Sequence, residues 1–274
     1  MKIDLSIDEK ETSIVIKDFI KTYVKKSVSK GVVIGLSGGV DSAVAAVLCS
    51  EALGKKNVRC FFLPDETTPI KDIEHQKLLV KRFGLQCEIK NITFVVKEMV
   101  KYCAVKPNKY ALANIKARIR MVLLYEYANM TNCLVCGTSN KSELLVGYFT
   151  KYGDGGVDIM PIGDIYKTQI RQLAKYLKIP NEIISKPPTA GLWKGQSDED
   201  ELKISYDKLD LILAGLEKKI DTKIISKEAD EEISVVERIK NMRRYSQHKR
   251  RTCLIPKVGV RTPGLDWRSP IQNK

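Results

Sequence analysis

Residues 32–48 of the chain read VVIGLSGGVDSAVAAVL: a short apolar run, the hexapeptide SGGVDS, and a second run of small and apolar residues. The run 32–36 is typical of a buried strand, and the residues after Ser42 are typical of a buried helix. A glycine-rich turn between a strand and a helix presents free backbone N–H groups and the positive end of the helix dipole. The stretch therefore predicts a site that binds an anion.

The alternation of strands and helices continues on both sides of this stretch. Apolar runs predict strands over 32–36, 58–63, 86–92 and 133–138. The helical spacing of apolar residues predicts helices over 8–30, 42–53, 70–83, 94–102 and 108–129. Strands separated by helices pair in parallel through right-handed crossovers. We therefore expect an α/β fold: a doubly wound, Rossmann-like parallel sheet with helices on both faces.

The pattern is looser in the C-terminal half of the chain. Helices are expected over 164–177, 206–213 and 227–245, and a long loop rich in proline, glycine and acidic residues is expected over 186–200. A basic tail, 247–270, follows the last helix. We find no internal repeat and no linker in the sequence, so residues 1–274 are expected to form one domain with a helical and basic C-terminal tail.

Composition limits the environment of the protein. The net charge of +14 suits nucleic acid or small polyanions such as nucleotides, and composition does not choose between them. Seven cysteines, an odd number, fit a reducing compartment better than a disulfide framework. Residues 1–13 are polar and acidic, unlike a signal peptide, and no apolar run approaches the roughly 20 residues that span a bilayer. We therefore expect a cytoplasmic protein with no membrane partner.

Several known loops can be compared with SGGVDS. The dinucleotide fingerprint G-x-G-x-x-G does not fit the spacing of Gly35, Gly38 and Gly39, and no Lys-Ser or Lys-Thr pair follows them as in a Walker A loop. Residues 35–39 do satisfy G-x-S-x-G, the nucleophile elbow of serine hydrolases, and His248 would complete the order of a triad. An elbow after the first strand, however, leaves no earlier strand and loop to supply the oxyanion N–H group. A simple tight turn accounts for the glycines but not for the serines and the aspartate.

A pyrophosphate-binding loop accounts for the whole hexapeptide. Ser37 and Ser42 can donate hydroxyl hydrogen bonds, and the two glycines between them let the backbone approach phosphate oxygens. Asp41 lies at the start of the helix and can hold a divalent cation against the phosphates. Because the Walker lysine is absent, the loop suits a pyrophosphate leaving group that is released as ATP is cleaved at its α-phosphate.

The succession of strand, SGGVDS and helix resembles the ATP-pyrophosphatase superfamily, with its sheet of the adenine nucleotide alpha-hydrolase type. Most of the chain, from about 34 to 250, is similar to the ammonia-dependent NAD synthetase family through four further stretches: NIKARIRM (114–121), GTSNKSELLVGYFTKYGDGGVDIMPIGDIYKTQ (137–169), KPPTAGL with SDEDELKISYD (186–207), and YSQHKR (245–250). The resemblance implies a reaction in two steps. The nicotinate carboxylate of deamido-NAD attacks the α-phosphate of ATP and releases pyrophosphate. Ammonia then attacks the acyl-adenylate, releases AMP and leaves the amide, NAD.

The resemblance also implies the residues of the site. ATP, the co-substrate, would be bound by the loop and three later residues: Gly35, Leu36, Ser37, Gly38, Gly39, Val40, Asp41, Ser42, Thr138, Lys167 and Thr189. Deamido-NAD would be bound by Arg118, Lys151, Asp158, His248 and Lys249. Mg²⁺ is the implied cofactor, with Asp41 and Glu143 as its ligands. Lys167 is the expected catalytic residue, because its ammonium would stabilise the pentacovalent phosphorus.

The helix expected over 108–129 leads to two further expectations. Two polar pairs flank its apolar stripe: Asn114 with Arg118, and Lys116 with Arg120. Only one pair can readily face a given ligand, and we expect Arg118 to do so. The helix is also apolar over much of its girth, which, together with the family resemblance, implies a homodimer.

Two other functions are compatible with a nucleotide-binding loop. An RNA-modifying relative would adenylate a tRNA base, but such enzymes usually carry an RNA-binding module or catalytic cysteines. We find neither in the sequence and expect no nucleic acid partner. A module that senses ATP without turnover would not need Glu143, Lys167 and Thr189 together. The chain also leaves no room for an amidase domain, so free ammonia is the expected nitrogen donor.

Overall fold

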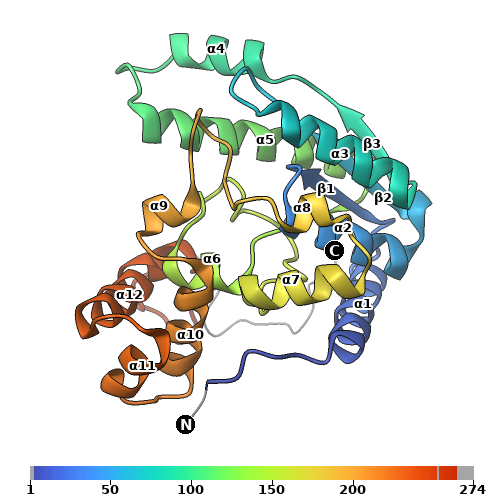
Figure 1. Ribbon diagram of the computed structural model, residues 1–274. Helices are drawn as coiled ribbons and strands as arrows, with labels where there is room; N and C mark the ends of the chain where they lie inside the picture. Colours follow the sequence, from blue (N-terminus) through green and yellow to red (C-terminus); the bar gives the residue numbers. More distant parts are fainter. Residues whose placement is uncertain (1–2, 252, 264–274) are drawn as a thin grey trace.

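The computed structural model describes residues 3–251 and 253–263 of the chain. Within them one sheet is formed by four strands: β1 (Val32–Leu36), β2 (Val58–Phe62), β3 (Gln86–Ile89) and β4 (Leu134–Cys136). Their order is β3-β2-β1-β4 and every pairing is parallel, with Val32 opposite both Val58 and Leu134 (Figure 1). The predicted α/β fold with a parallel sheet is therefore confirmed. β1, β2 and β4 are runs of mostly buried apolar residues, as a sheet covered on both faces requires.

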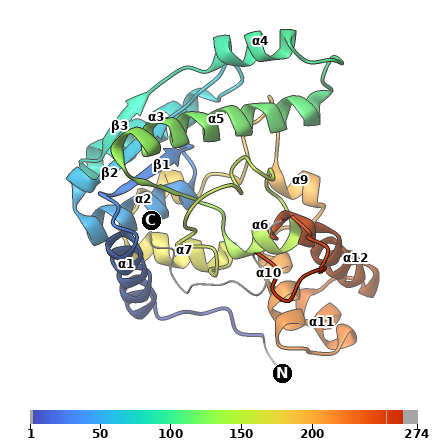
Figure 2. The same ribbon diagram turned by 180° about the vertical axis from the view of Figure 1, so that it is seen from behind.

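Helices cover both faces of the sheet (Figures 1 and 2). The helices on one face are α1 (Glu9–Lys26), α2 (Val40–Leu53), α3 (Ile70–Phe83), α7 (Lys167–Tyr176) and the short α8 (Asn181–Ile184). The other face is covered by α4 (Thr93–Lys101) and α5 (Lys109–Thr131). A 3₁₀ turn, η1 (Lys55–Asn57), precedes β2. Ten of the fourteen residues of α2 are buried, because small and β-branched side chains let it lie between the sheet and other helices.

β1 lies at the point where the order of the strands reverses. From β1 the chain continues to β2 and β3 on one side, and it later places β4 on the other side of β1. In open parallel sheets, ligands bind in the crevice at the carboxyl ends of the strands beside such a point. SGGVDS follows β1 and Thr138 follows β4, so two segments predicted to bind ATP meet at this crevice.

A second apolar core lies beside the sheet and is built from helices. Its helices are α6 (Lys141–Val146), α9 (Asp198–Leu202), α10 (Tyr206–Glu217), α11 (Thr222–Ala229) and α12 (Ile233–Tyr245), and the 3₁₀ turn η2 (Ser246–Lys249) follows them. Tyr206, Leu209 and Ile212 place one face of α10 in this core. In Figure 1, α10, α11 and α12 (orange to red) lie to one side of the sheet. β1–β4 with α1–α5 make up the sheet half of the protein, and α6 with α9–α12 the helical half.

The C-terminal part of the chain differs from the sequence predictions at three places. The prediction of one continuous helix over 227–245 is wrong. α11 and α12 are separate, because Asp230 has a left-handed backbone (φ 50°) that ends α11. The loop expected over 186–200 ends early, since Ser197 caps α9 by accepting a hydrogen bond from the N–H of Asp200. The helix expected from residue 164 begins instead at Lys167.

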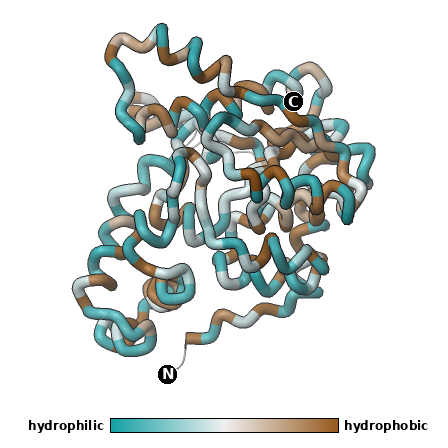
Figure 3. The backbone as a smooth tube through the Cα atoms, turned by 45° about the horizontal axis from the view of Figure 1, so that its top comes forward, coloured by the Kyte–Doolittle hydropathy of each residue, from teal (hydrophilic) through white to brown (hydrophobic). Residues whose placement is uncertain are grey.

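The hydropathy of the chain follows this arrangement. The strands are mostly buried apolar runs, whereas Figure 3 shows hydrophobic and hydrophilic segments alternating along the outer helices. This alternation is expected for helices with one buried face. None of the helices in the described residues combines the length and the hydropathy that a bilayer span requires.

Candidate active site

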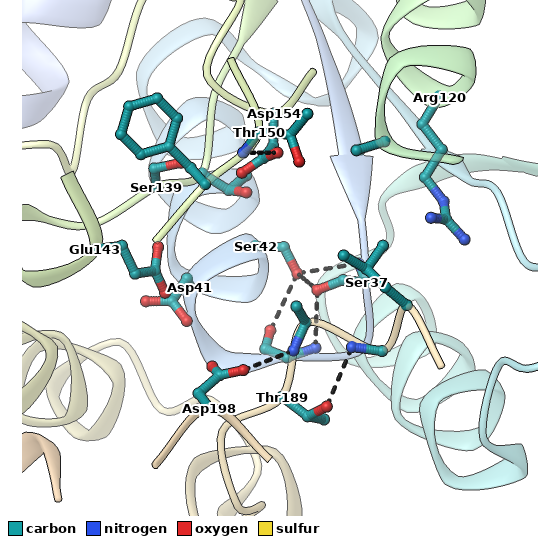
Figure 4. Close-up of a pocket in the computed structure, with 18 of the residues that line it drawn as sticks. Ser37, Asp41, Ser42, Arg120, Ser139, Glu143, Thr150, Asp154, Thr189 and Asp198 are labelled. Atoms are coloured by element: carbon teal, nitrogen blue, oxygen red, sulfur yellow. Dashed lines mark hydrogen bonds between the residues drawn. The ribbon is translucent and has the colours of Figure 1, made fainter. Parts of the chain in front are cut away.

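A cavity of about 490 Å³ lies at the carboxyl ends of β1, β2 and β4 (Figure 4). Its wall is formed by the SGGVDS loop, one side of α5, the start of α7 and residues 186–196. Ten of the eleven residues predicted to bind ATP line it: Gly35, Leu36, Ser37, Gly39, Val40, Asp41, Ser42, Thr138, Lys167 and Thr189. Gly38 is the exception, and it packs against α3 behind the loop. The structure therefore brings together segments that are far apart in the sequence.

Hydrogen bonds within the SGGVDS loop hold its shape. The N–H of Ser37 donates to Ser42 Oγ (3.2 Å), the two hydroxyl oxygens are 3.1 Å apart, and Ser42 Oγ donates to the carbonyl of Gly39 (3.1 Å). Gly38 has φ 75°, and a Cβ there would lie 2.6 Å from the carbonyl oxygen of Asp72, so the position requires glycine. No side chain of the described residues caps the N-terminus of α2. The positive end of α2 is therefore suited to an anionic ligand.

Three charged side chains meet beside the loop. Lys167 begins α7, and its Nζ contacts Asp41 Oδ2 and lies 3.8 Å from Glu143 Oε1. Asn140 Nδ2 donates to the other oxygen of Asp41 (2.9 Å), and its side chain also caps α6, the helix that carries Glu143. In Figure 4 the carboxylates of Asp41 and Glu143 lie side by side. The predicted catalytic lysine and both predicted metal ligands therefore belong to one cluster.

Burial and mutual charge shift the pKa values of this cluster. Burial and the nearby Asp41 carboxylate together raise the pKa of Glu143 well above its usual range. Burial alone would lower the pKa of Lys167, but the carboxylates of Asp41 and Glu143 raise it. Burial also raises the pKa of Asp198, a further cavity-lining acid that is attracted by Lys167. The cluster therefore holds more carboxylates than its ammonium can neutralise.

The excess of carboxylates around Lys167 bears on whether Asp41 and Glu143 suit Mg²⁺. Carboxylate oxygens are ligands that Mg²⁺ prefers, and a divalent cation beside Asp41 and Glu143 would remove the repulsion that helps to raise the pKa of Glu143. Within residues 3–251 and 253–263, no group of three or more histidine, cysteine or carboxylate side chains is placed to hold a metal ion. Mg²⁺ would therefore take its remaining ligands from phosphate oxygens and water, as it usually does in nucleotide sites. The residues fit that role.

Two residues of the helical half reach this cluster and were not predicted from the sequence. Asp198 accepts hydrogen bonds from Tyr148 Oη (3.0 Å) and from the N–H of Ala190 (2.9 Å). Tyr206 is fully buried with its ring centroid 5.2 Å from Lys167 Nζ, and its hydroxyl has no hydrogen-bond partner in the described part of the chain. The acidic run SDED gives no reason to choose one acid, and Tyr206 has the spacing of an ordinary core residue.

Of the residues predicted to bind deamido-NAD, Lys249 lines the cavity. Its Nζ donates to the carbonyls of Gly147 (2.7 Å) and Phe149 (2.9 Å). The remaining four are not among the residues that line the cavity: Arg118, Lys151, Asp158 and His248. Their role in binding stays a prediction.

Two of these residues contact each other without lining the cavity. Arg118 is exposed, and its Nε and Nη2 donate to the carbonyl of Lys151 at 3.3 Å. Asp158 accepts hydrogen bonds from the N–H of Val135 (2.8 Å) and from Tyr125 Oη (3.2 Å), so its carboxylate is engaged with β4 and α5. The structure thus places Arg118 beside Lys151 but outside the cavity wall.

The side of α5 that faces the cavity carries other polar residues. Arg120 lines the cavity, and its guanidinium donates to the carbonyl of Leu63 (3.0 Å) and to Asp65 (3.2 Å). Asn114 lines it as well and accepts a hydrogen bond from Thr150 Oγ1 (2.8 Å). The small residues Ala113 and Ala117 lie on this same side. These two alanines, spaced one helical turn apart, are the sequence signal that could have indicated which side of the helix meets a ligand.

An acid in the glycine-rich loop KYGDGG was also missed. Asp154 lines the cavity, and it accepts a hydrogen bond from the N–H of Thr150 (2.9 Å). Burial raises its pKa above the usual range for aspartate. An acid between glycines is typical of a solvated turn, so the sequence alone gives little reason to place it in a site.

Comparison with known proteins shows what the chain resembles. The family model described as NAD synthase matches residues 13–253. A curated NH(3)-dependent NAD(+) synthetase of Pelodictyon phaeoclathratiforme is 43% identical over 271 residues, which cover 98% of this chain and 97% of that protein. The corresponding protein of Archaeoglobus fulgidus is 47% identical over 236 residues, which cover 86% of this chain and 92% of that protein.

Solved structures give the same result for the fold. The NH3-dependent NAD synthetase from Campylobacter jejuni, in complex with the nitrate ion, has a TM-score of 0.79 and 35% identity, and the match covers 92% of this chain and 100% of that one. The NMN synthetase from Francisella tularensis has a TM-score of 0.82 and 31% identity, with the same coverage of 92% and 100%.

Proposed function

The chain belongs to the NAD synthase family, and we propose that its cavity uses ATP to join ammonia to deamido-NAD, giving NAD, AMP and pyrophosphate through an acyl-adenylate. The protein is thus a ligase that forms a carbon–nitrogen bond. A carboxylate is a poor electrophile, and adenylation converts its oxygen into a good leaving group. Catalysis then consists mainly of holding two anions in line and neutralising charge.

In the first step, the SGGVDS loop holds the β- and γ-phosphates. The hydroxyls of Ser37 and Ser42 and the backbone around Gly39 lie at the positive end of α2, which favours the pyrophosphate both before and after cleavage. Mg²⁺ on Asp41 and Glu143 would neutralise phosphate charge. Thr138 and Thr189, which also line the cavity, contact the rest of ATP.

Lys167 has the central role in the proposed mechanism. Its ammonium lies against Asp41 and near Glu143, a few ångströms from the loop that holds the leaving phosphates. As the nicotinate oxygen attacks, negative charge grows on the oxygens of the α-phosphorus, and a fixed ammonium there stabilises the transition state more than the ground state. The single observation that supports the function best is this lysine–carboxylate cluster beside a pyrophosphate loop.

In the second step, ammonia attacks the acyl carbon and AMP leaves. Deamido-NAD is bound by Arg118, Lys151, Asp158, His248 and Lys249, of which Lys249 already faces the cavity. Free ammonia is the nitrogen donor in this proposal, as the names of the related NH(3)-dependent enzymes suggest.

A product assay tests the function. The protein is incubated with ATP, Mg²⁺, deamido-NAD and ammonium, and NAD, AMP and pyrophosphate are expected in equal amounts. ADP as the nucleotide product would contradict adenylation, and ATP binding without turnover would indicate a sensor. Nicotinate mononucleotide is offered in parallel, because one similar structure is an NMN synthetase. A faster reaction with the mononucleotide would change the proposed substrate but not the proposed chemistry.

A substitution tests the metal assignment. Asp41→Ala is expected to lower turnover by at least about a hundredfold while far-UV circular dichroism stays unchanged, because the metal and Lys167 both lose a carboxylate. The same replacement at Asp18, an exposed acid on α1, is the control and is expected to leave turnover unchanged. Unchanged activity of Asp41→Ala would remove Asp41 from the proposed metal site.

We also propose that the protein is a homodimer and that α4 and α5 form its interface. Large apolar side chains are exposed along these helices, among them Phe94 (72% exposed), Val122 (67%) and Met130 (79%). Light scattering should show a dimer at micromolar concentration, and Val122→Asp should weaken it. Val28→Asp, at an equally exposed valine after α1, is the control. A wild-type monomer would contradict this proposal.

The remaining proposals concern domain organisation and location. One family model spans residues 13–253, which supports a single domain over 1–274. The last residues of the predicted basic tail lie outside the described residues. We propose that the protein works in the cytoplasm and that its partners are small molecules and a second copy of itself rather than nucleic acid.

A further inference from the structure

Asp210 on α10 is a buried charged residue that does not line the cavity, yet it is bonded to the elements that carry the cluster. It is 0% exposed. Its Oδ1 accepts a hydrogen bond from Ser142 Oγ (2.5 Å), and its Oδ2 accepts from the N–H (2.8 Å) and Oγ1 (2.9 Å) of Thr168. One carboxylate therefore joins three helices, because Ser142 belongs to α6 and Thr168 to α7.

The first turn of α7 depends on these bonds. The residue at its N-cap is Tyr166, whose N–H donates to Gln169 Oε1 (2.9 Å), and this bond leaves the N–H groups of the next two residues to other acceptors. The N–H of Lys167 donates instead to Ser142 Oγ (3.0 Å), and the N–H of Thr168 donates to Asp210. Free N–H groups at a helix start need acceptors, and an anion there is favoured by the helix dipole. Asp210 therefore supplies, from another helix, an acceptor for the first turn of α7 that the Gln169 bond does not provide.

Ser142 connects the same carboxylate to the predicted metal ligand. Its hydroxyl hydrogen is committed to Asp210, which leaves an oxygen lone pair to accept the N–H of Lys167. Glu143 is the next residue along α6, so its backbone is fixed by the same bond. The positions of Lys167 and Glu143 relative to each other are thus set through Ser142 and Asp210.

We propose that Asp210 is the positioning residue that holds Lys167 and Glu143 at the spacing needed to meet Asp41, an inference that rests on the function proposed above. Asp210 itself touches no substrate. Its effect is on the geometry of the reacting groups, where a displacement of about 1 Å can lower the rate of a reaction by roughly a hundredfold. Without the Asp210 carboxylate, the N–H of Thr168 loses its acceptor and the Lys167 ammonium loses its fixed place.

Steady-state kinetics of Asp210→Asn provide the test. The variant should lower kcat by about 10- to 100-fold with KM for ATP and for deamido-NAD within about threefold, because the loss falls on the transition state rather than on substrate binding. Asp164→Asn is the matched control, an acid that pairs with Lys141 of α6 at the surface and is 93% exposed. It should behave as the wild type.

A double variant separates positioning from general stability. If Asp210 acts through the lysine, then in a Lys167→Met background the change Asp210→Asn should lower kcat by less than about threefold further. Full additivity of the two effects would overturn the proposal. So would a folded Asp210→Asn protein with wild-type kcat.

The remaining outcomes are also decisive. If Asp210→Asn does not fold, Ser142→Ala replaces it, since it breaks the link to Lys167 and keeps both bonds of Asp210 to Thr168. A lower kcat with unchanged KM values would support the proposal, and a wild-type kcat would overturn it. A wild-type protein that forms no NAD would refute the proposed function and this inference together, whereas an active wild type with unaffected variants would refute this inference alone.

Discussion

The sheet half and the helical half contribute different kinds of groups to the same cavity. The sheet half presents backbone and hydroxyl groups of a short loop, and the hydroxyls of Ser37 and Ser42 bond to residues at most five positions away. The helical half acts through long-range contacts: Asp210 bonds to Thr168, 42 positions away, and Asn140 to Asp41, 99 positions away. The difference indicates that the positions of the hydroxyls proposed to bind phosphate are set locally, whereas the placement of the charges proposed to act in catalysis depends on how the halves pack.

The largest effect is expected where the halves meet, at Lys167. Lys167→Met should lower kcat about a thousandfold, equivalent to about 4 kcal/mol, because no other ammonium contacts Asp41 in the described residues. Turnover is measured as NAD formed, with pyrophosphate release as a check on the first step. Lys175→Met, an exposed lysine of the same helix, is the control. If both variants turned over normally, the Lys167 ammonium would not be needed for catalysis.

Two buried aspartates, one in each half, should respond to pH with opposite sign. Burial raises the pKa of Asp210 to about 6, so the folded protein keeps a proton that the unfolded chain releases near pH 4. Its contribution to the free energy of unfolding should therefore fall by about 3 kcal/mol as pH rises from 4 to 6. Despite burial, hydrogen bonds from Thr67 and the charges of Lys116 and Arg120 lower the pKa of Asp65. Asp65 should stabilise the fold above pH 4 and lose that contribution in acid.

Urea unfolding measures this contrast directly. The free energy of unfolding is determined between pH 3 and 7 for the wild type, Asp210→Asn and Asp65→Asn. The wild type should lose stability relative to Asp210→Asn as pH rises, and it should gain stability relative to Asp65→Asn from pH 3 to 5. If the wild type changed stability with pH in the same direction relative to both variants, the environments of Asp210 and Asp65 would not differ as described.

A smaller effect is expected at the locally encoded loop. Gly38→Ala should lower the free energy of unfolding by about 2 kcal/mol or more, since alanine is strained at φ 75° and its Cβ would meet the Asp72 backbone at 2.6 Å. Gly54→Ala is the control: it has φ 81° but open space around the new Cβ, so the strain alone should cost about 1 kcal/mol. If chemical denaturation gave equal losses of unfolding free energy for Gly38→Ala and Gly54→Ala, the contact with α3 would have no effect on stability.

The smallest effect concerns the break between α11 and α12. Asp230→Gly should stabilise the protein by about 0.5 kcal/mol, because glycine adopts the left-handed conformation at a helix end without strain. In one continuous helix over 227–245, the same change would destabilise by about 1 kcal/mol. The sign of the change in melting temperature therefore decides between the two structures, and a lower melting temperature would contradict the separation of the helices.

The sequence predicted well what depends on neighbours along the chain. Strands such as 32–36 and helices such as 70–83 follow from apolar patterns, and SGGVDS follows from its position between a strand and a helix. Asp41 and Ser42 could be placed because the start of α2 fixes which groups face the crevice. The break at Asp230 was missed because the apolar spacing continues across it, and the structure is needed to show the left-handed residue.

What the sequence could not supply is the packing of the helical half against the loop. Asp198, Tyr206 and Asp210 have no local feature that distinguishes them from surface acids or core aromatic residues. The preference for Arg118 over Arg120 required knowing which side of α5 faces the cavity, and only Arg120 lines it. That orientation is set by contacts with β1 and β4, far away along the chain.

Lys167 is the first residue of α7, so its ammonium stands at the positive end of its own helix, where a cation is disfavoured. Asp41 lies in the first turn of α2, where an anion is favoured. Their ion pair thus joins a cation that the dipole of α7 disfavours to an anion that the dipole of α2 favours. Once another cation occupies the Asp41 carboxylate, the backbone of α7 itself repels the ammonium. In the proposed reaction, an oxygen of the α-phosphate would then be the anion that balances the Lys167 ammonium.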